Sequence, residues 1–120
     1  MLIQRADDGA TVWKVEVADS WLSRLKGLIG RSSLPAGEGL YFPGTNGIHM
    51  LFMRFAIDCV FVADEMQDGA REVVAVRHNM RPWTGVVWFV RRARGAIELG
   101  AGSAAQAGIN VGDRVRLVSA

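Results

Sequence analysis

The chain has a single cysteine, Cys59, and therefore cannot form a disulfide within itself. Because disulfides belong to oxidising compartments, this absence favours a cytoplasmic protein. Cys59 lies between Asp58 and Val60 in an apolar stretch, where a buried structural thiol is more typical than a nucleophile. The first residues also lack the basic and then apolar segments of a secretory signal, so no export is predicted.

Long apolar runs and a strong charge of one sign are missing as well. A membrane helix needs about 20 apolar residues, and ionisable side chains interrupt every run here before that length, so no membrane span is predicted. The net charge of +2 gives no reason to expect a polyanionic partner. Only three prolines stand against 14 glycines, which indicates tight turns between short elements.

The composition is that of a globular protein. Half of the 120 residues are hydrophobic and 22% are charged. A chain of this length buries roughly two thirds of its unfolded surface. We therefore predict a single domain over residues 1–120, without a linker or an internal repeat.

Short strands account for most of the sequence. Residues 2–5 and 11–18 flank a turn at 7–10, and Val15 and Val17 share one face with Trp13 while the residues between them face the other way. This pattern predicts a hairpin. Further strands are predicted over residues 40–42, 48–53, 57–63, 73–77, 83–90, 96–99 and 114–118.

Helical spacing is confined to two places. Asp19 or Ser20 can cap an amphipathic helix over residues 21–29, and Ser103 can cap a one-turn helix that Gly108 ends. The elements together predict a mainly β (α+β) fold. We expect a compact barrel or sandwich of seven or eight short strands, with one short amphipathic helix covering an end.

Five motifs in order resemble the bacterial and archaeal family called domain of unknown function 192. They are GLIGR at 27–31, GEGLYF at 37–42, HMLFMRFAID at 49–58, AIELGAG at 96–102 and GINVGDRV at 108–115. The resemblance covers about residues 12–118 and implies a small β-rich domain without a known activity. The family usually has proline where this chain has Ala56, so the fixed φ before Ile57 is missing.

Charged residues inside the most hydrophobic segment define the candidate site. Between residues 48 and 63 only His49, Arg54 and Asp58 can ionise. Burying an unpaired charge costs several kcal/mol, so these groups must pair, hydrogen-bond or face a cleft. Arg54 and Asp58 fall on one side of a helix or a strand. They would stand about 13 Å apart on an unbroken strand, whereas a turn between them could bring them together.

Two interpretations remain open for this segment. In one, Arg54 and Asp58 form a structural ion pair that fixes the turn. In the other they line a polar pocket, to which Glu98 adds a carboxylate because it interrupts the apolar residues 96–99. The candidate ligand-binding cleft is then lined by His49, Arg54, Asp58, Glu98 and Arg31.

The function predicted from this cleft is binding of an unknown small molecule or protein, without catalysis. The alternative is a hydrolase in which Asp58 or Glu98 is the general base and Arg54 or Arg31 stabilises an anion. No nucleophile elbow, dinucleotide fingerprint or Walker sequence is present, so no cofactor is predicted.

Metal and nucleic-acid binding are weaker alternatives. The possible metal ligands His49, His78, Asp58 and Glu98 lack the spacing of a metal motif, so no metal site is predicted. Arginines alternate with aromatic residues in a pattern that could bind a nucleic acid, but acidic neighbours oppose it, and such a partner is not expected. The basic and aromatic residues are Arg77, Arg81, Trp83, Trp88, Phe89, Arg91, Arg92 and Arg94, and the acidic ones are Glu65, Asp68 and Glu72.

Overall fold

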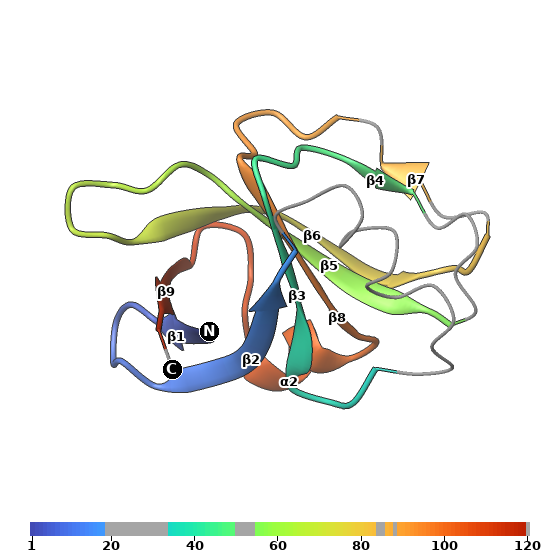
Figure 1. Ribbon diagram of the computed structural model, residues 1–120, viewed down its shortest axis with the longest axis horizontal. Coiled ribbons are helices and arrows are strands. Elements are labelled where there is room, and N and C mark those ends of the chain that lie inside the picture. The colour runs from blue at the N-terminus through green and yellow to red at the C-terminus, as the bar shows by residue number, and fades with distance from the viewer. Residues whose placement is uncertain (19–33, 50–54, 84–85, 88, 120) are drawn as a thin grey trace.

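The computed structural model describes residues 1–18, 34–49, 55–83, 86–87 and 89–119. Seven strands form a closed barrel in the order β1-β2-β3-β8-β5-β6-β9 (Figure 1). These strands are β1 (Leu2–Arg5), β2 (Thr11–Val17), β3 (Glu38–Pro43), β5 (Ile57–Val62), β6 (Arg71–Met80), β8 (Gly95–Gly100) and β9 (Arg114–Val118). The short strands β4 (Ile48–His49) and β7 (Val86–Val87) pair in a separate sheet, and α2 (Ser103–Ala107) is a short helix. The prediction of a mainly β fold with barrel architecture is confirmed.

The first and last strands close the barrel. Leu2 pairs with Lys14 of β2 on one side and with Val118 of β9 on the other. Both pairings are antiparallel, as are the other barrel pairings of the described strands except that of β2 with β3, which is parallel. A parallel pair cannot be joined by a tight turn, so the chain makes a long connection between β2 and β3.

The predicted hairpin at the start of the chain is confirmed. The amide of Ala10 donates to Oδ1 of Asp8 at 2.9 Å, and the amide of Arg5 donates to the carbonyl of Ala10 at 2.8 Å. Gly9 lies between them with φ of 73°, a left-handed conformation that glycine adopts without strain. The turn therefore follows from residues that are close in sequence.

The other predicted strands differ in how well their limits agree. Strand β9 has the predicted bounds, β5 is one residue shorter at its end, β8 is one residue longer at each end, and β3 and β6 are longer than predicted by two residues or more. The long strand predicted over residues 83–90 is wrong in extent, because β7 covers only two described residues and Trp83 has φ of 67°. The amphipathic helix predicted over 21–29 lies outside the described residues, as does the second half of the strand predicted over 48–53.

Two apolar clusters cover the two faces of the barrel wall. The inner cluster fills the barrel and takes residues from all seven of its strands: Ile3, Trp13, Val15, Tyr41, Val60, Val62, Val73, Ile97, Leu99, Ala104, Ile109 and Val115. The outer cluster lies on β3, β8, β5 and β6 and on the segments that cover them: Ala18, Leu34, Leu40, Phe42, Ile57, Cys59, Phe61, Ala75, Met80, Val90, Ala93 and Ala96.

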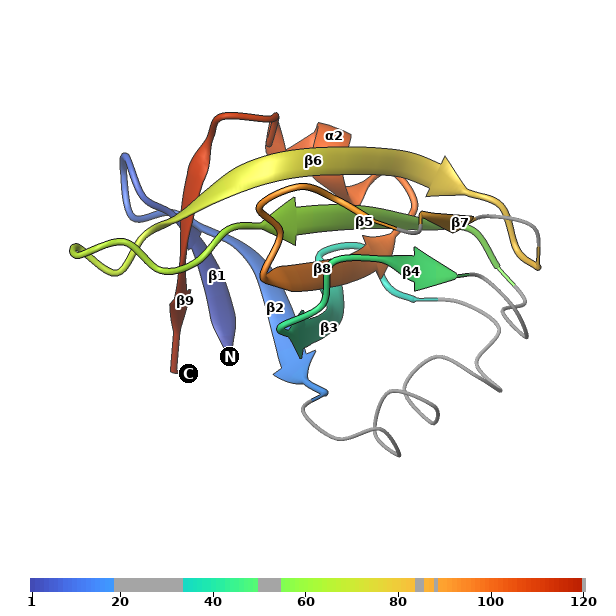
Figure 2. The same ribbon diagram turned by 90° about the horizontal axis from the view of Figure 1, so that it is seen from above.

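Strand β5 is buried on both faces, which explains why its sequence is almost continuously apolar. All six of its residues are buried, and they alternate between the two clusters. Figure 2 shows β4 and β7 lying over the barrel strands on the outer side. Backbone bonds attach this cover to its surroundings: the amide of Val90 donates to Asn46 at 2.7 Å, and that of Arg94 donates to Val62 of β5 at 2.8 Å.

Candidate functional site

Asp58 is a fully buried carboxylate whose oxygens are occupied by backbone amides. Oδ1 accepts a hydrogen bond from the amide of Asn79 at 2.9 Å. Oδ2 accepts from the amides of Gly102 and Ala104, both at 3.0 Å. Three backbone amides donate to its two oxygens, so Asp58 ties β5 to the end of β6 and to the start of α2.

These bonds replace the predicted cap of the short helix. Ser103 was predicted to cap α2, but the N-cap is Gly102, with φ of 92°, and no side chain of the cap bonds the helix. Asp58 of β5 accepts the hydrogen bond from the first turn of α2 that a capping side chain would otherwise accept. Because Asp58 is distant from α2 in the sequence, the residues around the helix do not predict this bond. The Ser103 hydroxyl instead accepts from the amide of Gly37 at 3.5 Å.

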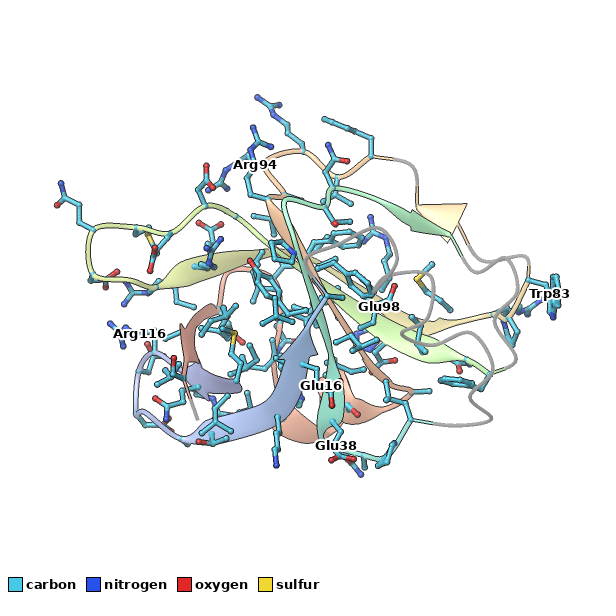
Figure 3. All side chains as sticks on the ribbon, in the orientation of Figure 1. Glu16, Glu38, Trp83, Arg94, Glu98 and Arg116 are labelled. Atoms are coloured by element: carbon cyan, nitrogen blue, oxygen red, sulfur yellow. The ribbon has the colours of Figure 1, made fainter. Side chains whose placement is uncertain are left out.

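Glu98 lies on the neighbouring strand but on the other face of the barrel wall. In the β5–β8 register Asp58 pairs with Leu99 and Glu98 pairs with Cys59. Leu99 belongs to the inner cluster and Cys59 to the outer one, so the two acidic side chains point in opposite directions. Asp58 faces the inner side and Glu98 faces the outer side, where the labelled side chain is seen in Figure 3.

On the outer face Glu98 belongs to a row of residues that are paired across five strands. The pairings link Glu16 to Leu40, Leu40 to Glu98, Glu98 to Cys59, and Cys59 to Arg77. Adjacent strands lie about 4.8 Å apart, so the backbones of Glu16 and Arg77 each lie roughly 10 Å from that of Glu98. The immediate neighbours of Glu98 are therefore an apolar side chain and a thiol.

This apolar setting changes the protonation of Glu98. Burial raises the pKa of its carboxyl to about 8, from a usual value of 4.5. Among the described residues, none donates a hydrogen bond to this carboxyl. Glu98 is half-buried, and its carboxyl oxygens are not among the fully buried side-chain atoms without a partner, of which the described residues contain one, Thr45 Oγ1. Burial, and in second place the Glu98 carboxyl, also raises the pKa of the Cys59 thiol.

The structure thus separates the two predicted carboxylates instead of bringing them into one cleft. Arg31 and Arg54 lie outside the described residues, and so does the side chain of His49. The described partners of Asp58 are backbone amides, and the structural ion pair with Arg54 stays a prediction. Ligand binding by the predicted set also stays a prediction.

Metal ligands do not gather in the part of the chain that the structure describes, where no group of three or more His, Cys, Asp and Glu could hold an ion. His78 lies exposed on β6. One acidic neighbour of the arginine-rich segment is bonded to it: Arg92 forms two hydrogen bonds to Glu72, at 3.2 and 3.3 Å. Phe89 is 68% exposed beside this segment.

No helix among the described residues is long and apolar enough to cross a membrane.

One pocket of the outer face was missed by the sequence analysis. It lies over β2 and β3 and is bordered by the charged residues Lys14, Glu16 and Glu38. The alternation of β2 correctly predicted that Lys14 and Glu16 face away from Trp13, but nothing local predicted that β3 would run parallel beside them. Figure 3 labels Glu16, Glu38 and Glu98, which come from three adjacent barrel strands.

The protein is thus a small β-barrel in which the Asp58 carboxyl lies on the inner face of the wall and the Glu98 carboxyl on the outer face. The sequence matches DUF192, described as an uncharacterized ACR, over residues 2–117, and the chain belongs to this family. No curated protein matches the chain.

Two solved structures share the fold. One is a protein of unknown function from Novosphingobium aromaticivorans, with a TM-score of 0.79 and 23% identity, and the match covers 98% of this chain and 84% of that one. The other is described as a putative transcription regulator from Sinorhizobium meliloti, with a TM-score of 0.75 and 23% identity, covering 96% of this chain and 89% of that one. At these identities the similarity concerns the fold.

Proposed function

We propose that this protein is a binding module that holds a small ligand against the outer face of the barrel, with the carboxyl of Glu98 as the polar contact. The observation that carries this proposal is a half-buried carboxyl beside an apolar cluster, with a raised pKa and without a hydrogen-bond donor among the described residues. A ligand that reaches this carboxyl can supply the missing hydrogen bond.

The protonation of Glu98 indicates which ligand chemistry fits. With a pKa of about 8, the carboxyl is protonated roughly ten to one at pH 7. A neutral carboxyl donates one hydrogen bond and accepts another. An amide presents the matching acceptor and donor side by side, and the position of Glu98 at the edge of the apolar outer cluster favours an apolar body next to it. We therefore propose a small ligand with an amide group on an apolar chain.

The alternative of a hydrolase is weakened for Asp58 and kept for Glu98. A general base must come within hydrogen-bond reach of its substrate, and the oxygens of Asp58 are buried and bonded to three amides. Glu98 has the near-neutral pKa that suits proton transfer. Both functions thus depend on one residue, and the experiment must separate binding from turnover.

Hexanamide is a suitable probe, because it combines an amide with an apolar chain. Its binding is measured by calorimetry for the wild-type protein, Glu98→Gln and Glu98→Leu, with Glu65→Leu at an exposed position as the control. A glutamine keeps a donor and an acceptor at every pH. We expect Glu98→Gln to keep the affinity, Glu98→Leu to lose about tenfold or more, and the control to be unchanged. The wild type should also bind more weakly above pH 8.

Equal binding to the wild type and to Glu98→Leu would refute the proposal. Hydrolysis of hexanamide, followed by release of ammonia, separates the alternative: an enzyme would lose turnover in Glu98→Gln while still binding the probe. The single buried cysteine agrees with a reducing compartment, and a cytoplasmic location stays a prediction.

A further inference from the structure

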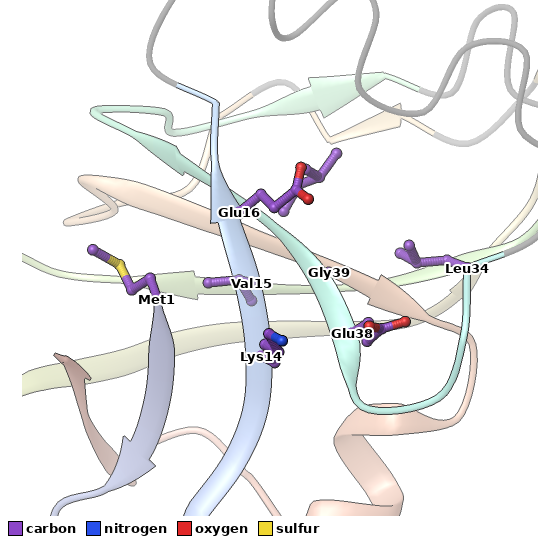
Figure 4. A pocket seen from close by; sticks show the side chains of 8 residues that line it. Met1, Lys14, Val15, Glu16, Leu34, Glu38 and Gly39 are labelled. Carbon is purple, nitrogen blue, oxygen red and sulfur yellow. The ribbon is translucent and has the colours of Figure 1, made fainter. Parts of the chain in front are cut away.

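A second feature of the outer face lies apart from the Glu98 carboxyl. The pocket over β2 and β3 has a volume of about 220 Å³ (Figure 4). Its lining residues are Met1, Lys14, Val15, Glu16, Leu34, Glu38, Gly39 and Leu40. The volume equals that of roughly seven water molecules and falls below the 300–1,000 Å³ typical of pockets for drug-sized ligands. It suits a molecule of the size of a single amino acid.

Three charged side chains stand together on this face because β2 and β3 run parallel. The register pairs Lys14 with Glu38 and Glu16 with Leu40. Neighbouring positions are about 4.8 Å apart across the strands and about 6.6 Å apart along them. In the described part of the chain, the ion pairs involve other groups, and Lys14 joins neither glutamate. One cation and two carboxylates therefore face the same space without neutralising each other by contact.

The apolar side of the pocket is held in place by the backbone. Leu34 and Leu40 are 9% and 4% exposed. The chain at Leu34 packs tightly on β8, because a Cβ at Gly100 would come within 2.5 Å of the Leu34 carbonyl oxygen. The amide of Lys14 donates to the carbonyl of Gly37 at 2.8 Å, which fixes the turn before β3 to β2. The wall is thus formed before any ligand arrives, which lowers the cost of binding.

We propose that this pocket binds a small zwitterion with an apolar side chain, of the class of a free aliphatic α-amino acid. The ammonium group lies toward Glu16 and Glu38, the carboxylate toward Lys14, and the aliphatic side chain against Leu34 and Leu40. Figure 4 shows the Glu16 and Glu38 side chains on the side of Leu34, with Lys14 beside Glu38. Each charge of the ligand meets an opposite charge, while a simple amine leaves Lys14 without a partner and a simple acid leaves both glutamates without one.

Three probes test the proposal: L-leucine, 3-methylbutan-1-amine, which lacks the carboxylate, and 4-methylpentanoate, which lacks the ammonium. Binding is followed by the backbone amide shifts of β2 and β3 in NMR titrations. Wild-type protein should bind leucine about fivefold or more tightly than either truncated probe, since each exposed charge pair contributes modestly. A leucine affinity no better than that of both truncated probes would overturn the proposal.

Charge variants assign the roles within the pocket. Lys14→Met should reduce the leucine affinity to that of the amine and leave the amine itself unaffected. The double variant Glu16→Gln with Glu38→Gln should reduce the affinity for leucine to the affinity for 4-methylpentanoate. Glu65→Gln, at an exposed position away from the pocket, is the control and should change nothing. Unaltered leucine binding in Lys14→Met would contradict the proposal. Glu98 does not line this pocket, although its strand neighbour Leu40 does, so Glu98→Gln, which keeps the size of the side chain, should keep leucine binding whether or not the proposed function holds.

Discussion

Asp58 and Glu98 occupy adjacent strands one position out of register, and for this reason their carboxyl groups face opposite sides of the barrel wall. Asp58 points inward and is stabilised as an anion by three amides. Glu98 points outward into an apolar cluster and is held as the neutral acid at neutral pH. The Asp58 carboxyl therefore stabilises the fold, whereas ionisation of the Glu98 carboxyl lowers the free energy of unfolding.

Replacing Asp58 with asparagine should destabilise the protein. The amide NH₂ group of asparagine cannot accept a hydrogen bond, so at least one of the three backbone donors loses its partner in a buried site. We expect the free energy of unfolding to fall by about 2–4 kcal/mol, measured by urea denaturation at pH 7. The control is Asp68→Asn, since Asp68 is exposed and pairs with Arg114 and Arg116 at 3.6 and 3.4 Å. Its loss should cost about 1 kcal/mol or less, and equal losses in the two variants would contradict the role of Asp58.

Glu98 should make the protein less stable as the pH rises. Its pKa is about 8 in the folded protein and 4.5 without burial, so the folded state binds the proton more tightly between these values. The stabilisation is complete below pH 4.5 and is lost as the pH rises to 8 and above, by at most about 5 kcal/mol. Urea denaturation at pH 5.5 and pH 9 measures the loss. Glu98→Gln should lack this component and be more stable than the wild type at pH 9, and parallel profiles of the two proteins would disprove it.

Gly39 should tolerate a side chain much less well than Gly95. A Cβ at Gly39 would lie 2.1 Å from the carbonyl oxygen of Glu98, which belongs to the backbone of β8 and cannot move freely. A Cβ at Gly95 would meet the ring of Tyr41 at 2.8 Å, and that side chain can rotate away. Gly39→Ala should therefore cost about 3 kcal/mol or more and Gly95→Ala about 1–2 kcal/mol in thermal or urea unfolding. The reverse order would mean that the close β3–β8 contact is not rigid.

Cys59 should be inert in the folded protein. Its thiol is fully buried, and burial raises its pKa, so little of the reactive thiolate forms at neutral pH. Ellman's reagent should label the thiol slowly in buffer and rapidly in concentrated urea. Rapid labelling in buffer, at a rate that urea does not increase, would show that the outer cluster opens readily around β5.

Local patterns in the sequence were sufficient to predict most strands of the barrel. The turn at Asp8 and Gly9 and the alternation around Trp13 depend on neighbours in the chain, and both predictions are confirmed. Closure of the sheet into a barrel depends instead on which distant strands pair, such as β3 with β8. Strand propensity does not encode that choice, so barrel and sandwich could not be distinguished.

The sequence indicated that the Asp58 carboxyl is bonded within the protein, but it did not indicate which groups bond it or where Glu98 lies relative to it. The cost of burying a charge correctly indicated that Asp58 must be bonded within the structure. Its partners are backbone amides, which carry no side-chain signal in a sequence, and two of them follow β8, far along the chain. The opposite orientations of Asp58 and Glu98 follow from the register of β5 with β8, and a shift of one residue would have placed both carboxyls on the same face.

Because Ile3 pairs with Leu117, the barrel is closed by the pairing of the first of its strands to be synthesised with the last of them. The first strand is made long before its second neighbour exists, and its open edge can pair with other chains during that interval. Such distant pairings also slow folding, because the ends of a long loop must meet. Synthesis of β9 is thus the event that closes the barrel, and nascent chains halted before β9 should be the ones most prone to aggregate.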